Sequence, residues 1–257
     1  MMHLYQFPRA RACPSFSPFC LKLETWLRMA ELPYKNVSNR FLKKSERGQV
    51  PFICLPDGRY LSDSNLIIHQ LTVLHQVTHL QPDTADAHAM SVTLDRLLEQ
   101  SLFWTMVYDR KEIVNDELFG RDGYGENMGW LQYLRPFVVM YLQFVFTSKL
   151  HHQGYGRLTR EEIALVHREN LSALSTFLRD KPFFLGDKPK TIDATAFGHL
   201  CQFWCCPVDT AGKRALLENR SFANLVRFLN RMKTRFWPDW VDATKHQQLN
   251  SNTALDK

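Results

Sequence analysis

The segment 48–71 constrains the fold of this chain more than any other, because a proline stands where a strand should begin and a helix start follows soon after. Val50-Pro51 leads into a short apolar run typical of a buried strand, and Pro56-Asp57-Gly58 then signals a turn. Residues 59–61 are long enough only for a partner strand. Ser62-Asp63-Ser64 supplies helix-capping side chains ahead of apolar residues at helical spacing. The segment therefore predicts a β-hairpin followed by a helix that ends near residue 77.

Pro51 stands at the first residue of a predicted strand, where the missing N–H is tolerated. We expect the Val50–Pro51 bond to be trans, because that is the commoner form for a single proline. A cis bond is the alternative. It would turn the Val50 backbone outward, where it could pair with an extended ligand.

The first 80 residues have the pattern of a small α/β unit. Residues 3–7 predict the first strand, and Ser17-Pro18 starts a helix because serine is a strong N-cap and proline suits the first helical position. That helix is expected to stop before Pro33, and residues 34–38 predict a second strand. Strand, helix, strand, strand, strand, helix is the thioredoxin-like order, so we predict a thioredoxin-like domain over residues 1–80.

Strand signals nearly vanish after Gln81-Pro82-Asp83, so an all-α domain is predicted over residues 84–242. Its helices are expected over about 85–110, over 127–150 with a kink at Pro136, after a capping box formed by Thr159 and Glu162, over 193–203, and over 221–236. The remaining residues, 243–257, are polar and are predicted to be disordered.

Composition excludes several classes of protein. The formal charge of +6, from 32 basic and 26 acidic residues, suits a mildly anionic ligand, and no basic arm or finger-like metal spacing supports a nucleic-acid partner. The most apolar run, 137–146, is interrupted by Gln143 and is far shorter than the ~20 residues that span a bilayer. We therefore expect neither nucleic-acid binding nor a membrane span.

The six cysteines show no disulfide framework, and no signal peptide begins the chain, so we expect reduced thiols and a cytoplasmic protein. His199, Cys201, Cys205 and Cys206 together could suggest a metal. They fall in a strongly apolar helix, and no matching ligand pair stands elsewhere. We therefore expect buried core residues and no metal.

Ser17-Pro18-Phe19-Cys20 has the spacing of a C-x-x-C redox motif whose first cysteine is replaced by serine, which rules out ordinary dithiol exchange. A helix N-terminus favours negative charge, so the Ser17 hydroxyl could donate to the sulfur of a bound thiol and favour its thiolate. Lowering a thiol pKa by two units needs ~2.7 kcal/mol. A hydrogen bond to a charged group contributes ~1.5–3 kcal/mol. The simpler alternative is that Ser17 only caps the helix.

Asp63-Ser64 opens the next predicted helix and could hold an amino-acid head group. The Ser64 hydroxyl and N–H suit a carboxylate, and Asp63 suits an ammonium group. Helix capping alone is again the alternative.

These motifs together resemble the glutathione transferase superfamily. The resemblance rests on Gly48-Gln49-Val50-Pro51, the hairpin and Asp63-Ser64 in the first half, and on Phe184-Leu185-Gly186-Asp187 and residues 193–200 in the second. Residues 15–29, with the Phe-Gly-His-Leu helix, are similar to the failed-axon-connections and metaxin-like branch of that superfamily. The resemblance covers nearly the whole chain.

The resemblance implies a glutathione site formed by Gln49, Val50, Pro51, Asp63 and Ser64. The Val50 backbone would pair with the cysteinyl part of glutathione, and Asp63 and Ser64 would hold the γ-glutamyl group, with Gln49 assisting. Glutathione would be a co-substrate.

The same resemblance implies that Ser17 stabilises the thiolate. Tyr5 is the runner-up, because other classes use a tyrosine on the first strand, and Cys13 is a third candidate that would act through a mixed disulfide. A second-substrate pocket would lie between the domains. Trp104 and Tyr108, one helical turn apart, are its candidate lining residues, although core packing explains them nearly as well.

Two positions depart from the family pattern. Lys190 stands three residues before Asp193, where the family has serine or threonine, and Thr191 comes one place late. Capping by Thr191 in an altered register would preserve the motif. Asp63 replaces a longer glutamine or glutamate and has a shorter reach.

Two functions follow from the resemblance. The first is a homodimeric, glutathione-dependent transferase that conjugates or reduces a small apolar electrophile. The alternative is a non-catalytic adaptor or import-type binding module of the metaxin-like kind.

Overall fold

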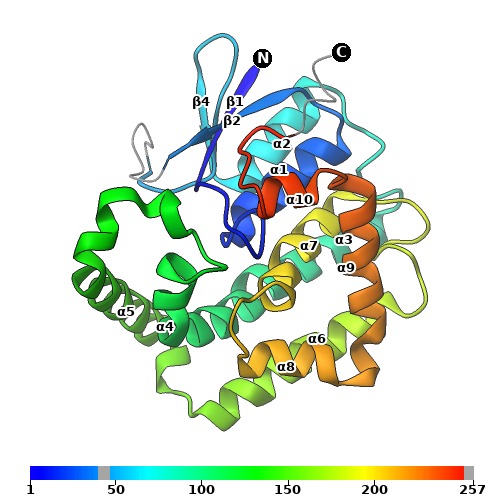
Figure 1. The fold of residues 1–257 in the computed structure, drawn as a ribbon. Helices are drawn as coiled ribbons and strands as arrows, with labels where there is room; N and C mark the ends of the chain where they lie inside the picture. The colour runs from blue at the N-terminus through cyan, green and yellow to red at the C-terminus, as the bar shows by residue number, and fades with distance from the viewer. Residues whose placement is uncertain (40–46, 252–257) are drawn as a thin grey trace.

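The computed structural model describes residues 1–39 and 47–251, in which a small sheet stands on a larger group of helices (Figure 1). The strands pair in the order β2-β1-β3-β4, with β1 parallel to β2 and antiparallel to β3, and β3 antiparallel to β4. The strands are β1 (Met2–Gln6), β2 (Tyr34–Ser38), β3 (Phe52–Cys54) and β4 (Tyr60–Ser62). The predicted thioredoxin-like α/β domain followed by an all-α domain is confirmed.

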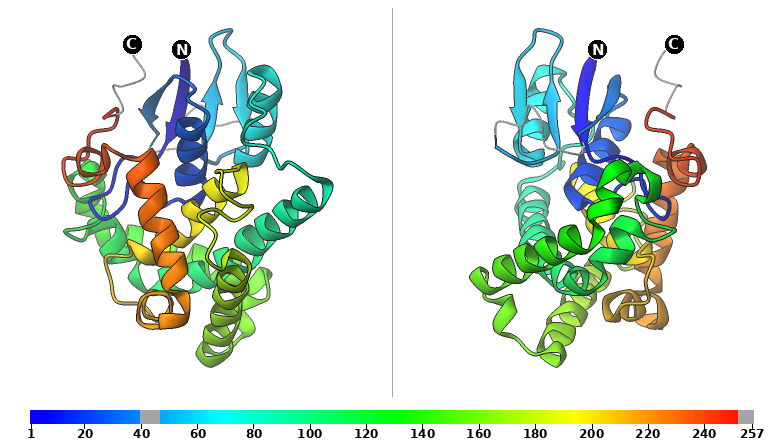
Figure 2. Two further views of the ribbon diagram at one scale, coloured as in Figure 1. Left: turned by 90° about the vertical axis from the view of Figure 1, so that its right-hand side faces the viewer. Right: turned by 60° about the vertical axis from the view of Figure 1, so that its left-hand side comes forward.

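The helices of the described residues fall into two groups (Figure 2). Those beside the sheet are α1 (Pro18–Met29) and α2 (Ser64–Leu74). The helical domain contains α3 (Ala85–Arg96), α4 (Phe103–Phe119), α5 (Arg135–His152), α6 (Arg160–Leu178), α7 (Thr191–Trp204), α8 (Ala211–Glu218), α9 (Ala223–Phe236) and α10 (Trp240–Thr244). Within the described part of the chain, none of these helices is long and apolar enough to cross a membrane.

Two predicted helix boundaries are wrong. The helix that begins at Ala85 does not end near residue 110, because a π-helical turn, Leu97–Leu102, carries α3 into α4 and the chain stays helical up to Gly120. The next long helix begins at Arg135 rather than at 127. Pro136 lies in its first turn, where a proline has no helical N–H to lose, so it starts the helix instead of kinking it.

Helix α1 is buried almost completely. It lies against α7 at Gly198, where an added Cβ would stand 2.6 Å from the Pro18 carbonyl oxygen and 2.9 Å from the Lys22 nitrogen. Glycine is therefore required for the two backbones to approach this closely. This contact fixes the start of α1 relative to the helical domain.

The polar residues of α1 are buried because they are paired. The Glu24 carboxylate accepts hydrogen bonds of 2.6 Å from both Nη1 and Nη2 of Arg9, and a third of 2.6 Å from Gln6. Burial opposes ionisation, but the charge and hydrogen bonds of Arg9, helped by Arg28, lower the pKa of Glu24 to about 2. The sheet domain thus contains a buried, ionised carboxylate.

The C-terminal segment is ordered as far as Ser251, so the predicted disorder from residue 243 is wrong for these residues. The Asn250 side chain accepts from the Asn36 N–H at 2.6 Å and donates to the Asn36 carbonyl at 3.1 Å. The Leu249 carbonyl accepts from Arg9 at 3.0 Å. The Asn250 side chain thus pairs with the backbone of Asn36 at the exposed edge of β2 in place of water. Residues 252–257 lie outside the described residues.

Lys190, not Thr191, is the N-cap of α7, so the expectation of capping by Thr191 is wrong. Asp193 accepts the backbone N–H groups of Lys190 and Phe184 at 2.7 and 2.8 Å, which anchors the helix start without a capping hydroxyl. The Thr191 hydroxyl instead accepts from Trp26 Nε1 at 3.1 Å and joins α7 to α1. Burial raises the pKa of Asp193 to about 7.

Candidate functional site

A cleft of about 680 Å³ opens between the sheet domain and helices α4 and α5. The sheet domain contributes Phe7, Phe19 and two segments, 47–51 and 62–65, and the helical domain contributes an apolar wall and further basic residues. The cleft brings together six residues that the sequence proposed: Gln49, Val50, Pro51, Asp63, Ser64 and Trp104.

Val50 offers its backbone to the cleft. Neither its N–H nor its carbonyl forms a backbone hydrogen bond with another described residue, because β3 begins only at Phe52. The Val50–Pro51 bond is cis, so the expectation of a trans bond is wrong. The sequence permits either isomer at an X-Pro bond and does not decide between them.

Asp63 caps α2, as the simpler interpretation predicted. Its Oδ1 accepts from the backbone N–H groups of Asn65 and Leu66 at 3.0 and 3.2 Å. The residue has a φ of +77°, which is uncommon for a non-glycine residue. Capping uses one carboxylate oxygen and leaves the other for a ligand.

Ser64 is the first residue of α2 and lines the cleft, with 6% of its surface exposed. The N–H of a first helical residue has no partner within the helix. Ser64 therefore presents both an N–H and a hydroxyl at the positive end of the α2 dipole, which is a favourable environment for an anion.

None of the three candidate thiol activators is among the described residues that line the cleft. Ser17 caps α1 by accepting from the Cys20 N–H at 3.3 Å, although Phe19, two residues further on, does line it. Tyr5 stacks on Phe52, with ring centroids 4.5 Å apart, on the surface of the sheet. Cys13 has no exposed surface.

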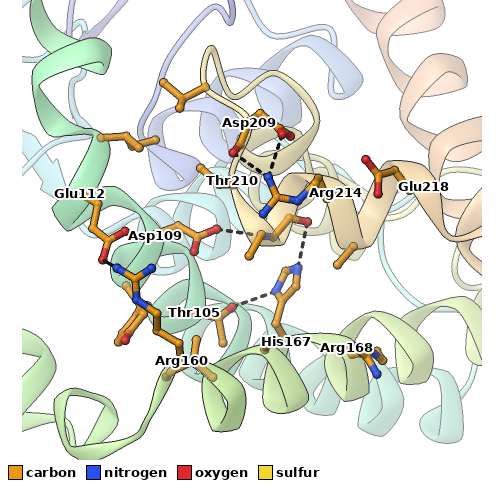
Figure 3. Close-up of a pocket in the computed structure, with 18 of the residues that line it drawn as sticks. Thr105, Asp109, Glu112, Arg160, His167, Arg168, Asp209, Thr210, Arg214 and Glu218 are labelled. Carbon is orange, nitrogen blue, oxygen red and sulfur yellow. Dashed lines mark hydrogen bonds and ion pairs between the residues drawn. The ribbon is translucent and has the colours of Figure 1, made fainter.

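Trp104 and Tyr108 face different cavities. Tyr108 lines a second cavity of about 790 Å³ between α4, α6 and α8, so the predicted pair does not form one pocket wall. Figure 3 shows two ion pairs in this second cavity, and the distances are 2.6 Å between Arg160 and Glu112 and 2.7 Å between Arg214 and Asp209.

His167 joins the helices that surround the second cavity. Its Nδ1 lies 3.1 Å from the Thr105 hydroxyl and its Nε2 lies 3.2 Å from the Gly212 carbonyl oxygen (Figure 3). Burial lowers the pKa of His167 to about 4, which keeps the ring neutral at pH 7. Both ring nitrogens are occupied, so the residue holds α8 against α4 and α6.

A buried polar network lies beneath the first cleft, and the sequence analysis missed it. Lys22 Nζ, which is fully buried, donates to Asn65 at 2.5 Å, to Glu99 at 2.7 Å and to Asp95 at 3.1 Å. Asn65 also donates to Glu99 at 2.8 Å, and both residues line the cleft. Two carboxylates share one ammonium group here, so the floor of the cleft carries excess negative charge.

The opposite rim of the cleft is basic. Arg47 contributes from the sheet domain, and Lys149 and His152 contribute from the end of α5. Phe103, Trp104 and Phe146 supply the apolar wall of the cleft. The cleft is therefore negative at its floor, positive at its rim and apolar along one side.

Family models match both halves of the chain. The model described as "Glutathione S-transferase N-terminal domain" matches residues 18–118, and the one described as "Glutathione S-transferase, C-terminal domain" matches residues 167–232. This chain belongs to the glutathione transferase superfamily.

Curated relatives place it in the branch that contains Failed axon connections and metaxin proteins. It is 32% identical to Failed axon connections of Drosophila melanogaster over 98% of this chain, but spans only 62% of that protein. It is 36% identical to the Metaxin-1 homolog of Caenorhabditis briggsae, over 97% of this chain and 78% of that one. It is also 28% identical to the isoprene-epoxide–glutathione S-transferase of a Rhodococcus species, over 92% and 99% of the two chains.

Solved structures confirm the fold. A glutathione S-transferase of Ceriporiopsis subvermispora in complex with glutathione is similar, with a TM-score of 0.64 and 17% identity over 91% of this chain and 96% of that chain. At this identity the likeness shows the fold alone.

Proposed function

We propose that the protein binds glutathione in the cleft between its two domains and stabilises the thiolate for attack on a small apolar electrophile. The observation that carries the proposal is the convergence of three groups in one cleft: the Val50 backbone, which forms no backbone hydrogen bond with another described residue, the N-terminus of α2 at Ser64 and the apolar wall. A structure of similar fold that was solved in complex with glutathione supports it, and so does the relative that is a glutathione S-transferase.

The charges of the cleft suit the two ends of glutathione. The γ-glutamyl carboxylate would accept from the Ser64 N–H and hydroxyl, and its ammonium group would lie near Asp63 and Glu99, where the floor is negative. The glycine carboxylate would lie toward Lys149 on the basic rim. The cysteinyl segment would pair with the Val50 backbone, as a strand adds to an edge.

Ser17 remains the proposed thiolate stabiliser. It is half-buried at the N-cap of α1, and its neighbour Phe19 lines the cleft, so the sulfur would lie near the positive end of the α1 dipole. The α1 dipole and the Ser17 hydroxyl would then both stabilise negative charge on the glutathione sulfur.

The thiolate proposal is tested by the ultraviolet absorbance of bound glutathione across a pH series, measured in wild type, Ser17→Ala and Ser17→Thr. We expect a lowered thiol pKa in wild type, loss of that shift in Ser17→Ala and its recovery in Ser17→Thr, which restores both the cap and the hydroxyl. Turnover with a panel of small epoxides and other apolar electrophiles should follow the same order. An unshifted thiol in wild-type complex would rule out this mechanism.

We also propose that the protein forms a homodimer through an apolar surface on α5 and the segment before it. Seven large apolar side chains there are 41–81% exposed: Trp130, Tyr133, Leu134, Phe137, Met140, Tyr141 and Phe144. An aromatic side chain can bury roughly 150–250 Å² of surface. The exposed parts of the seven side chains on this α5 face therefore offer on the order of 700–1,000 Å² of surface for contact. That area matches the ~800 Å² that each partner contributes to a standard interface.

Sedimentation analysis tests the dimer. Phe137→Asp with Phe144→Asp should convert a wild-type dimer into a monomer, whereas Val73→Asp, at a similarly exposed apolar position on α2, should leave the dimer intact. A wild-type monomer at micromolar concentration would contradict the proposal.

The second candidate function is a non-catalytic adaptor. The observation that favours it is that Ser17, Tyr5 and Cys13 all lie outside the cleft lining formed by the described residues. Glutathione bound with an unshifted thiol pKa and no turnover would support this function over the first.

We propose a cytoplasmic location for the protein under either function. The six free thiols support it.

A further inference from the structure

Three cysteines from distant parts of the chain meet where the loop after β1 contacts the end of α7. The sulfur of Cys13 lies 3.8 Å from that of Cys201, which lies 3.5 Å from that of Cys205. All three sulfur atoms lie within 4.8 Å of one another. The cluster was not predictable, because Cys13 and Cys201 are separated by 188 residues in the sequence.

This spacing suits a shared metal ion. Sulfur ligands at 2.3 Å from a tetrahedral zinc ion stand about 3.8 Å apart, which lies within the range observed for the cluster. Thiolates select soft or borderline cations such as Cu⁺ and Zn²⁺ over Mg²⁺ or Ca²⁺. We propose that Cys13, Cys201 and Cys205 form a binding site for a thiophilic d¹⁰ metal ion, Zn²⁺ or Cu⁺.

The site is closed on one side and reachable on the other. Cys13 and Cys201 have no exposed surface, whereas Cys205, at the C-cap of α7, is half-buried. Within the described part of the chain, no other histidine, cysteine or carboxylate joins the group. Three ligands complete a trigonal Cu⁺ site, and Zn²⁺ would take a water as its fourth ligand from the Cys205 side.

Cysteines bind metal ions as thiolates, so metal binding at this cluster would displace thiol protons to solvent.

Ordinary apolar packing is the competing explanation, because a buried cysteine behaves as a small hydrophobic residue. Cys20 shows that case. It is fully buried outside the cluster, and burial raises its pKa to about 11. The cluster differs because three sulfurs converge on one point.

Metal binding would link the loop that leads to Ser17 with the end of α7. Cys13 stands four residues before Ser17, so a bound ion would restrain this loop relative to the helical domain. The inference does not depend on glutathione binding.

The test is titration of the reduced, chelator-treated full chain with Zn²⁺, with Cu⁺ under argon, and with Cd²⁺ as a spectroscopic probe. We expect one ion per chain, a sulfur-to-cadmium charge-transfer band, release of protons on binding and a raised melting temperature. Cys13→Ser, Cys201→Ser and Cys205→Ser should each weaken binding by more than the roughly 10–100-fold that loss of an outer contact costs. Cys54→Ser, in a half-buried cysteine outside the cluster, should leave binding unchanged.

A second measurement needs no variant. In wild type, bound metal should slow alkylation of Cys13, Cys201 and Cys205, located by mass spectrometry, and leave Cys54 as reactive as before. The proposal is overturned by folded protein that binds no ion at stoichiometric concentration, by binding that survives Cys13→Ser, or by equal protection of every thiol.

Discussion

Gly198→Ala adds one methyl group where α1 and α7 come closest. The new Cβ would lie 2.6 Å from the Pro18 carbonyl oxygen, 2.9 Å from the Lys22 nitrogen and 3.0 Å from the Lys22 Cβ. Carbon contacts are favourable at about 3.5–4.0 Å, so the helices must separate by roughly half an ångström or more. The two closest atoms belong to the backbone of α1 and cannot rotate away.

The net effect combines two opposing contributions. Overpacking a close contact costs ~1–3 kcal/mol, and replacing glycine by alanine inside a helix returns up to ~1 kcal/mol. We expect a net loss of about 1–2 kcal/mol, which lowers the melting temperature by about 2–8 °C for a chain of this size. Because the start of α1 carries Phe19 to the cleft, glutathione affinity should fall as well.

Thermal and urea unfolding of Gly198→Ala, with Ala173→Gly as the matched control, provide the assay. Ala173 is exposed on α6, so its replacement reports helix propensity alone and should destabilise by ~1 kcal/mol. The protein with alanine is thus expected to be more stable than the protein with glycine at position 173, and less stable at position 198. A Gly198→Ala variant more stable than wild type would refute the close-packing argument.

Three further predictions concern stability. Glu24→Gln should cost about 3 kcal/mol at pH 7, because it removes the carboxylate that balances the buried charge of Arg9. The folded pKa of about 2 lies below the unfolded value, so the difference in urea-unfolding free energy between variant and wild type should shrink as pH falls from 4.5 toward 2. A difference that stays constant over this range would contradict the prediction. His167 has a folded pKa of about 4, so this residue should contribute a loss of about 3 kcal/mol of stability as pH falls from 6.5 to 4, and His167→Gln should remove that contribution. Asn250→Ala should increase hydrogen exchange at the Asn36 amide, which it covers at 2.6 Å, and unchanged exchange there would argue against an ordered C-terminal segment.

Local signals predicted the fold well, since turns, caps and apolar spacing are decided by neighbouring residues. Ser17, Thr159 and Asp63 cap their helices as the sequence indicated. The predicted kink at Pro136 is wrong, because a proline can either kink a helix or begin one, and Pro136 lies in the first turn of α5.

Long-range pairing explains most of what the sequence could not show. Lys22 and Glu24 stand on opposite faces of α1, so a one-sided helix would expose at least one of them, yet both are buried by partners from distant segments. The sequence placed Val50, Asp63 and Ser64 in one site through family motifs. It did not separate Tyr108 from Trp104, because spacing along a helix does not say which cavity each side chain faces.

The central claim is that the cleft between the domains binds glutathione. Isothermal titration of glutathione into wild type, Ser64→Ala and Tyr108→Ala tests it most directly, because Ser64 lines this cleft and Tyr108 lines the other cavity. We predict one site per chain, binding that Ser64→Ala weakens by about tenfold or more, and wild-type affinity in Tyr108→Ala. No binding at millimolar glutathione, or binding that only Tyr108→Ala weakens, would contradict the account.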